Sequence, residues 1–102
     1  MKFVVLESFK ADYRRLSPSD QALFKKVLRE FVDACDRYAL DATTPWPASL
    51  RVRSVASAPG IWEMTWSFSG PDGRATFEWV RVQGAPAVRW RRIGDHKIFR
   101  EP

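Results

Sequence analysis

Residues 62–68, Trp-Glu-Met-Thr-Trp-Ser-Phe, contain the clearest periodic pattern of the chain. Apolar and polar residues alternate, as in a β-strand that buries one face, and the apolar set is Trp62, Met64, Trp66 and Phe68. Gly-Pro-Asp-Gly follows at 70–73. This motif is typical of a turn, because proline fixes φ and glycine accepts a positive φ. The stretch therefore predicts a hairpin with a second strand from residue 74.

The second strand is expected over residues 74–82, with Ala75, Phe77 and Trp79 on its apolar side. Pairing residue 69 with residue 74 would set Trp66 opposite Phe77, and Met64 opposite Trp79. A further loop at 83–86 precedes a third strand at 87–93, in which Trp90 would face Trp79. The three strands would then share one apolar face, which needs a covering layer.

Two helices are predicted before these strands. After an apolar strand at residues 3–6, Ser8 is a candidate cap for a short helix. Ser17 and Pro18 are typical of a helix start, and the apolar stripe behind them continues to about Tyr38. The loop at 41–49 would pack through Trp46, and residues 50–54 are predicted to form a short strand.

This order of elements predicts an α+β fold of the type β-α-α-β-β-β. An N-terminal strand and a two-helix hairpin would pack on a mainly antiparallel sheet. The 102 residues suit a single domain that spans residues 1–102.

The charge balance favours a polyanionic partner. The chain has 17 Lys and Arg residues against 12 Asp and Glu, a net charge of +5 at pH 7. Beyond residue 50, every basic residue except Lys97 is an arginine, whose planar fork suits phosphate and stacks on bases. Nucleic acid is the leading partner class, although basic surfaces also serve solubility.

Cysteine and histidine usage limits the chemistry. Cys35 is the one cysteine and lies on the apolar stripe of the long helix, so we expect a core residue in a reducing compartment. One cysteine and one histidine cannot build a zinc shell, and we expect no metal and no cofactor. No apolar run approaches the ~20 residues that span a bilayer, so the expected location is cytoplasmic, away from membranes.

The C-terminal strand and the residues behind it form the candidate site. Arg89, Arg91 and Arg92 lie close together, and His96 and Lys97 follow. In the predicted register Glu78 faces Arg91, and Arg74 faces Asp95, so cross-strand ion pairs account for part of this charge. The arginines exceed what balancing Glu78 requires. Histidine moves a proton near neutral pH, which suits general acid–base catalysis on the uncovered face of the sheet.

The motifs, in this order, resemble those of the RelE/ParE superfamily of type II toxins. They are Pro59-Gly60-Ile61-Trp62-Glu63-Met64, Gly73-Arg74-Ala75-Thr76-Phe77-Glu78 and Arg92-Ile93-Gly94-Asp95-His96-Lys97-Ile98-Phe99. The resemblance implies a metal-independent mRNA endonuclease, either ribosome-dependent or free, that inhibits translation. In such toxins the RNA 2′-hydroxyl attacks the adjacent phosphate, which leaves a 2′,3′-cyclic phosphate and a 5′-hydroxyl.

The resemblance also implies roles for individual residues. His96 would be the acid or base, and Arg74 would stabilise the charge of the phosphorane. Phe99, at the place of the family's terminal aromatic, would stack on a base. The cations expected to hold phosphates are Arg51, Arg53, Arg91, Arg92 and Lys97. The implied partners are a cognate acidic antitoxin and mRNA.

Two alternatives stay open, and a departure from the family pattern supports the second of them. Relatives carry lysines in the middle strand, where this chain has Glu63 and Thr65. The first alternative is a non-enzymatic poison of DNA gyrase, as in the ParE branch. The second is an RNA- or protein-binding module that has kept the fold and lost the activity.

Overall fold

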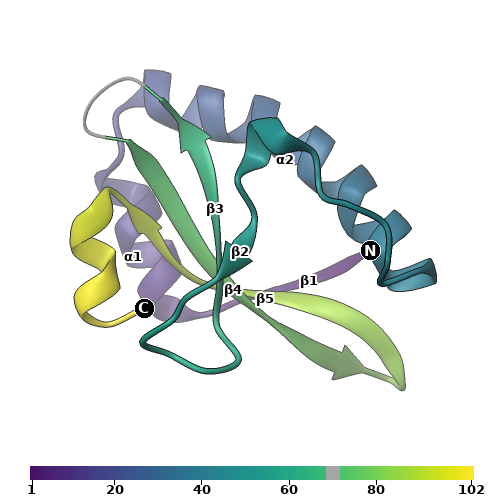
Figure 1. Cartoon of the computed structure of the whole chain (residues 1–102). Coiled ribbons are helices and arrows are strands. Elements are labelled where there is room, and N and C mark those ends of the chain that lie inside the picture. The colour runs from purple at the N-terminus through teal and green to yellow at the C-terminus, as the bar shows by residue number, and fades with distance from the viewer. Residues whose placement is uncertain (69–71) are drawn as a thin grey trace.

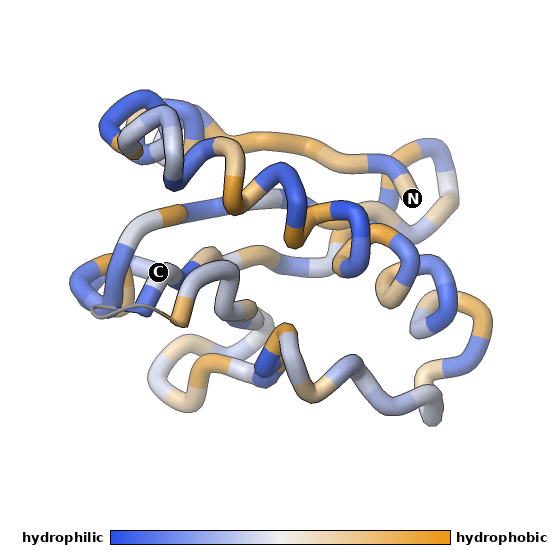
Figure 2. Tube along the Cα trace, turned by 90° about the horizontal axis from the view of Figure 1, so that it is seen from above, coloured by the Kyte–Doolittle hydropathy of each residue, from blue (hydrophilic) through white to orange (hydrophobic). Residues whose placement is uncertain are grey.

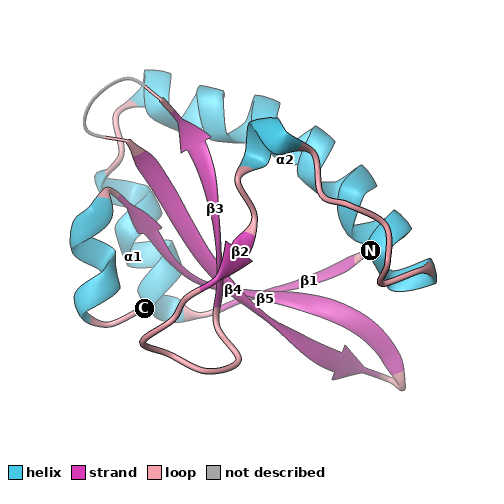
Figure 3. Ribbon diagram, in the orientation of Figure 1, coloured by secondary structure: helices cyan, strands magenta, loops and turns pink. Residues whose placement is uncertain are grey.

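The computed structural model describes residues 1–68 and 72–102 (Figure 1). Five strands form one sheet in the order β1-β5-β4-β3-β2, in which β1 is parallel to β5 and the other pairs are antiparallel. Two helices pack on this sheet, and the predicted α+β fold is confirmed (Figure 3). The elements are β1 (Lys2–Val5), α1 (Glu7–Arg15), α2 (Pro18–Leu40), η1 (Ala48–Leu50), β2 (Arg53–Ser54), β3 (Trp62–Ser67), β4 (Gly73–Val82), β5 (Ala85–Gly94) and η2 (His96–Arg100).

The helix starts show one correct and one wrong prediction. The Ser17 side chain accepts a hydrogen bond from the backbone N–H of Asp20 at 3.1 Å, as expected of a cap. Ser8 is not a cap: α1 begins at Glu7, and the Ser8 hydroxyl donates to the carbonyl oxygen of Arg91 at 2.7 Å. This bond fixes the start of α1 to β5. Hydrophobic and hydrophilic residues alternate around the turns of α2, while β1 is almost wholly hydrophobic (Figure 2).

Aromatic rings fill the space between α2 and the sheet. Phe31 of α2 is fully buried, and its ring centroid lies 5.0 Å from those of Phe77 and Trp90. The predicted packing of the 41–49 loop is confirmed, because Trp46 stacks on Tyr38 at 4.8 Å. Rings of this kind supply most of the apolar area that a chain of this size can bury.

The predicted pairing of β3 with β4 is wrong by four residues. Trp62, not Trp66, lies opposite Phe77, and a bulge interrupts the ladder between Thr65 and Ser67. Phe68 lies beyond the end of β3 and is 52% exposed, so it does not join the apolar face. The turn expected at 70–73 lies partly outside the described residues.

Gly73 explains the observed register. It is the first residue of β4 rather than part of a turn, and it is buried. A Cβ at this position would lie 2.6 Å from the ring of Trp66, whose Nε1 donates to the carbonyl oxygen of Arg74 at 3.0 Å. Glycine therefore allows the indole to lie directly on the strand, a close-approach role that the turn interpretation had missed.

The β4–β5 connection is shorter than predicted. Gln83 and Gly84 both have positive φ, 51° and 79°, which is the geometry of a two-residue type I′ turn. The strands therefore extend to Val82 and Ala85, and Trp79 faces Val88 while Phe77 faces Trp90.

The strand expected at residues 50–54 forms only in part. Ala48–Leu50 is a short 3-10 helix, and β2 contains only Arg53 and Ser54. Between them Arg51 has φ of 45°, in the left-handed region that a non-glycine residue rarely occupies. The outer edge of β3 is thus paired with β2 only at Trp62 and Glu63 within the described part of the chain.

A buried carboxylate connects α1 to the edge of β5. Asp12, only 7% exposed, accepts hydrogen bonds from Arg92 Nε at 2.6 Å and from the backbone N–H of Ile93 at 3.2 Å. Arg92 Nη2 adds a second bond at 3.2 Å. Asp12 therefore satisfies a backbone group that the short strand β1 leaves unpaired, and it neutralises one arginine at the same time.

Candidate functional site

The sheet face opposite α2 carries the predicted polar residues, but its middle is not open to solvent as expected. Glu63, Thr65 and Thr76 are all buried. Near the chain end, the Pro102 carbonyl oxygen accepts hydrogen bonds from Thr76 Oγ1 and Arg91 Nε, each at 3.0 Å. The C-terminal residues thus lie against this face, and access is limited to its margins.

Glu63 organises one margin. Its Oε1 atom accepts hydrogen bonds from Arg53 Nε and Arg74 Nη1, each at 2.8 Å. Arg74 Nη2 also lies 3.5 Å from Asp72 Oδ2, and the Arg74 side chain is 14% exposed. The predicted catalytic arginine is therefore held in a fixed orientation by two carboxylates.

Arg51 lies beside this group and is held more loosely. Its Nη1 atom is 3.9 Å from Asp72, and its guanidinium carbon lies 4.9 Å from the centre of the Phe68 ring. A cation over an aromatic face is a weak attraction at an exposed site. The side chains of Arg51 and Arg53 are both more than half exposed, so both can still reach an anion.

Glu78 organises a second group on β4 and β5. It binds Arg89, its direct cross-strand partner, at 2.8 Å, and it also binds Arg91. The predicted Glu78–Arg91 contact therefore exists, although the register differs by two residues. Burial acts to raise the pKa of Glu78, but the hydrogen bonds from both arginines outweigh burial and hold that pKa below its ordinary value.

Glu78 makes the stability of the chain pH-dependent. Its pKa is lower in the folded chain than the ordinary value of 4.5, so its stabilising effect is complete above about pH 4.5. The effect is lost as pH falls through the lowered folded pKa. We expect Glu78→Gln to unfold more easily than the wild type at pH 7, and the difference to shrink towards pH 3. Urea unfolding at both values measures it.

The control for this experiment is Glu7→Gln, which removes an exposed ion pair with Lys10 and should change little at either pH. A Glu78→Gln difference that stays constant from pH 7 to pH 3 would contradict the assignment.

Arg92 is further from the predicted site than the sequence indicated. Its hydrogen bonds to Asp12 raise the pKa of the guanidinium, and Arg92 Nη1 donates to the carbonyl oxygen of Glu101 at 3.1 Å. Because Asp12 lies on α1, these bonds turn Arg92 towards that helix. This arginine joins α1 to β5 rather than the group around Arg74.

The predicted acid–base residue lies at the same end of the sheet as Arg74. Arg74 pairs with Gly94, the last residue of β5, and His96 follows two residues later at the start of η2. Asp95 does not pair with Arg74, since its carboxylate accepts from the backbone N–H of Lys97 at 2.8 Å. The exposed side chains of His96 and Lys97 form no hydrogen bond or ion pair with the residues described.

Phe99 lies near the C-terminal end of the chain and is partly exposed, whereas Cys35 lies in the core. Phe99 lies in η2 and is half-buried, without an aromatic neighbour in the described ranges. Cys35 is fully buried, and burial raises the pKa of its thiol to about 12, which keeps it protonated. Cys35 is thus a core residue, as predicted.

Residues 1–68 and 72–102 offer neither a metal-binding cluster nor a membrane-spanning helix. They contain no cluster of three or more His, Cys, Asp or Glu side chains able to hold a metal ion. Their helices include none that is both long and apolar enough to cross a membrane.

Sequence reasoning missed the anchoring carboxylates. Asp12 was assigned no role from the sequence, and Glu63 was treated only as one member of a polar strand face. The available signal was the excess of arginine beyond residue 50, which requires partners wherever the arginines are partly buried.

Two solved structures are similar to this chain. One is a YoeB/ParE toxin from Agrobacterium tumefaciens, with a TM-score of 0.56 and 12% identity over 94% of this chain and 99% of that one. Another is the free state of E. coli toxin RelE with two arginines replaced by alanine. It has a TM-score of 0.58 and 10% identity, over 98% of this chain and 90% of that one. No protein-family model and no curated protein matches the sequence.

These likenesses define the class of fold. Both similar structures are described as bacterial toxins, and each aligns with nearly the whole of this chain. The chain shares the fold of these two structures, which is the fold that the resemblance had implied. At 10–12% identity, what is shared is the course of the backbone.

Proposed function

We propose that this chain is the toxin of a type II toxin–antitoxin system and cleaves mRNA without a metal ion. The observation that carries the proposal is the pairing of Arg74 with Gly94. This pairing places a fixed guanidinium and the exposed imidazole of His96 at one end of the sheet, and a cation together with an acid–base group is suited to phosphodiester cleavage. The RelE/ParE toxin fold supports the same reading.

The proposed chemistry is an internal transesterification. The 2′-hydroxyl oxygen of the RNA attacks the adjacent phosphorus, and the bond from phosphorus to the 5′ oxygen breaks. One proton leaves the 2′ oxygen and one is gained by the 5′ oxygen, and His96 serves one of these transfers. Arg74 donates hydrogen bonds to the phosphorane oxygens. The products are a 2′,3′-cyclic phosphate and a 5′-hydroxyl.

The surrounding cations would position the RNA backbone. Arg51, Arg53 and Lys97 are exposed, and they flank Arg74 and His96. Arg91 donates a hydrogen bond to Glu78, and Arg92 donates hydrogen bonds to Asp12. Because these guanidinium groups already have carboxylate partners, we assign both arginines a smaller part in RNA binding. Phe99 remains the proposed stacking residue for a base near the cleavage point.

The proposal extends to partners and location. A toxin of this class requires a cognate antitoxin, and an acidic one suits the net charge of +5. We further propose that the mRNA is cleaved on the ribosome, in the cytoplasm, and that translation stops as a result.

A second candidate function is an RNA- or protein-binding module without catalytic activity. It is favoured by the ion pairs of Arg74, because a guanidinium already neutralised by Glu63 and Asp72 attracts a phosphate less strongly. A gyrase poison would require neither His96 nor RNA.

Expression in bacteria separates these functions. We expect growth arrest together with new mRNA 5′ ends that carry a hydroxyl group, mapped by sequencing of total RNA. Arrest without such ends, combined with inhibition of purified gyrase in a supercoiling assay, would establish the poison instead. Normal growth at a verified level of folded protein would establish the inert module.

A further inference from the structure

An apolar groove of about 490 Å³ lies between α1, the first half of α2 and strand β1. Its walls are apolar and mostly aromatic, and they come from β1 (Phe3, Val5), α1 (Phe9, Tyr13) and α2 (Phe24, Leu28). Val5 is 37% exposed and Phe3 is only partly buried, so both side chains can be reached from solvent. Neither Arg74 nor His96 lines this groove, and the proposed function does not use it.

The outer edge of β1, beside the groove, has no strand next to it. β1 is the end strand of the sheet, and within the described residues it pairs only with β5. The backbone N–H of Leu6 donates to the carbonyl oxygen of Trp90 on β5 at 3.0 Å. Because backbone groups point to opposite sides at successive residues of a strand, those of Phe3 and Val5 face the open side. Such an edge can pair with another extended chain, and no proline or charged residue from 3 to 5 prevents this.

Three cations surround the apolar walls of the groove. Lys10, Arg14 and Lys25 line it, and all three residues are exposed. Lys10 is paired with Glu7, whereas Arg14 and Lys25 form no ion pair with the described residues. The rim therefore keeps an excess of positive charge and favours a partner with carboxylates. A second copy of this chain would instead set the same cations against each other.

We propose that β1 and this groove bind an extended acidic segment of another protein, which adds a sixth strand to the five-stranded sheet. Main-chain hydrogen bonds join the segment to Phe3 and Val5. Apolar side chains of the segment enter the groove, and carboxylates at its ends pair with Arg14 and Lys25. A small apolar anion would fill the groove but leave the edge of β1 unpaired, whereas a polypeptide fits both features. The inference goes beyond the proposed function and holds whether or not RNA is cleaved.

Binding of a short peptide to the full chain tests this assignment. The probe is Glu-Thr-Val-Thr-Val-Thr-Glu, capped at both ends, in which one face of an extended strand carries two valines between two glutamates. The comparison peptide has lysine in place of both glutamates. We expect the glutamate peptide to bind about tenfold more tightly, because the lysine peptide places like charges beside Arg14 and Lys25. Isothermal titration calorimetry measures both affinities.

N-methylated probes test strand addition itself. Alternate N–H groups of an added strand point towards β1 and away from it, so methylation of one set removes hydrogen bonds and methylation of the other set does not. One probe is methylated at both valine nitrogens, and the other at two threonine nitrogens. We expect one of these probes to lose binding and the other to keep it. Hydrogen exchange should show that the amides of Phe3 and Val5 become protected when the unmodified probe binds.

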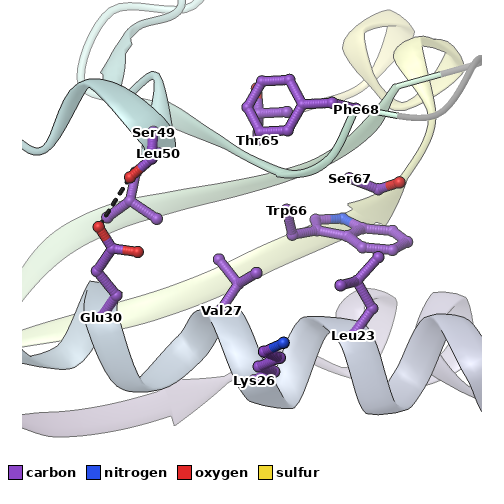
Figure 4. Close-up of a pocket in the computed structure, with 10 residues that line it drawn as sticks. All are labelled: Leu23, Lys26, Val27, Glu30, Ser49, Leu50, Thr65, Trp66, Ser67 and Phe68. Carbon is purple, nitrogen blue, oxygen red and sulfur yellow. Dashed lines mark hydrogen bonds between the residues drawn. The ribbon is translucent and has the colours of Figure 1, made fainter.

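Lys25→Glu tests the place of the carboxylates. This change should weaken binding of the glutamate peptide about tenfold, because it reverses a charge at the rim of the groove. The matched control is Lys26→Glu, which makes the same change at the next residue of α2. Lys26 is also exposed, but it lines a separate cavity between α2, η1 and β3 (Figure 4). Equal unfolding temperatures of the two variants establish that both are folded.

The results distinguish an acidic strand from other occupants. Binding that prefers glutamate, depends on one set of peptide nitrogens and is weakened by Lys25→Glu alone supports the proposal. Absence of binding, equal binding of the glutamate and lysine peptides, equal binding of the two methylated probes or an equal effect of Lys26→Glu overturns it. If the chain is a dimer whose Phe3 and Val5 amides are protected without peptide, the edge is occupied by a second copy and the proposal is wrong. None of these outcomes decides the nuclease proposal, which is judged by mRNA ends.

Discussion

Asp12→Ala is expected to lower the free energy of unfolding by about 3–5 kcal/mol, the usual effect of removing one partner of a buried ion pair. The change leaves the Arg92 guanidinium, a quarter exposed, without its carboxylate, and it leaves the backbone N–H of Ile93 without an acceptor. For a chain of this length the unfolding temperature should fall by more than about 10 °C. Thermal and urea unfolding followed by circular dichroism measure both quantities.

Two further variants make the Asp12 result specific. Asp33→Ala removes an ion pair between Arg37 and the Asp33 carboxylate, which is 71% exposed. This change should lower the free energy of unfolding by less than about 1 kcal/mol. Asp12→Ala combined with Arg92→Leu removes both charges and should recover part of the lost stability. If Asp12→Ala costs no more than Asp33→Ala, the carboxylate does not hold α1 to β5 as described.

His96→Ala is expected to reduce the rate of RNA cleavage about 100- to 10,000-fold, the range for loss of a general acid or base. Its side chain is exposed and forms no bond within the described residues, so the fold should be unaffected. The comparison uses purified protein, programmed ribosomes and quantified 5′-hydroxyl ends.

The matched control is Arg81→Ala. Arg81 lies on β4 at the hairpin end, far along the strand from Arg74, and donates only to the carbonyl oxygen of Gly84. Arg74→Ala is a less clean test than His96→Ala, because it also leaves the buried Glu63 with only Arg53 as a partner. Undiminished cleavage by folded His96→Ala would exclude histidine catalysis.

Much of the fold could be predicted from local patterns. The long helix α2 followed from its Ser17 cap and apolar stripe, and the three central strands followed from alternation and turn residues. These features depend on neighbours in sequence. The packing of Trp46 followed from its position in an otherwise polar loop.

The pairing of strands depends on contacts between distant residues and was predicted less well. A glycine after proline and aspartate is typical of a turn, but Gly73 serves a distant indole, and this shifts the ladder by four residues. Likewise, Gln83 has a positive φ, a conformation that is usually found at glycine or asparagine. This conformation allows a two-residue turn, so the loop of the second hairpin is shorter than predicted. Neither effect can be read from a window of neighbouring residues.

The candidate site was predicted as a set of residue types rather than as an arrangement. The sequence indicated that arginine and histidine gather at the C-terminal strands, and the β4–β5 pairing brings Arg74 and the start of η2 to one end of the sheet. It did not indicate which arginines would be engaged by Glu63, Glu78 and Asp12. Those pairings depend on burial, because a charged side chain that is removed from water needs an oppositely charged partner to offset its lost hydration.

The place of β1 affects when the chain can fold during synthesis. β1 precedes the other four strands in the chain, yet its only strand partner among the described residues is β5, the strand of the sheet that is made after all the others. Loops that close such long separations form slowly, and they close only after the final strand has left the ribosome. A nascent chain therefore carries an unpaired, mostly apolar β1 until β5 has been synthesised.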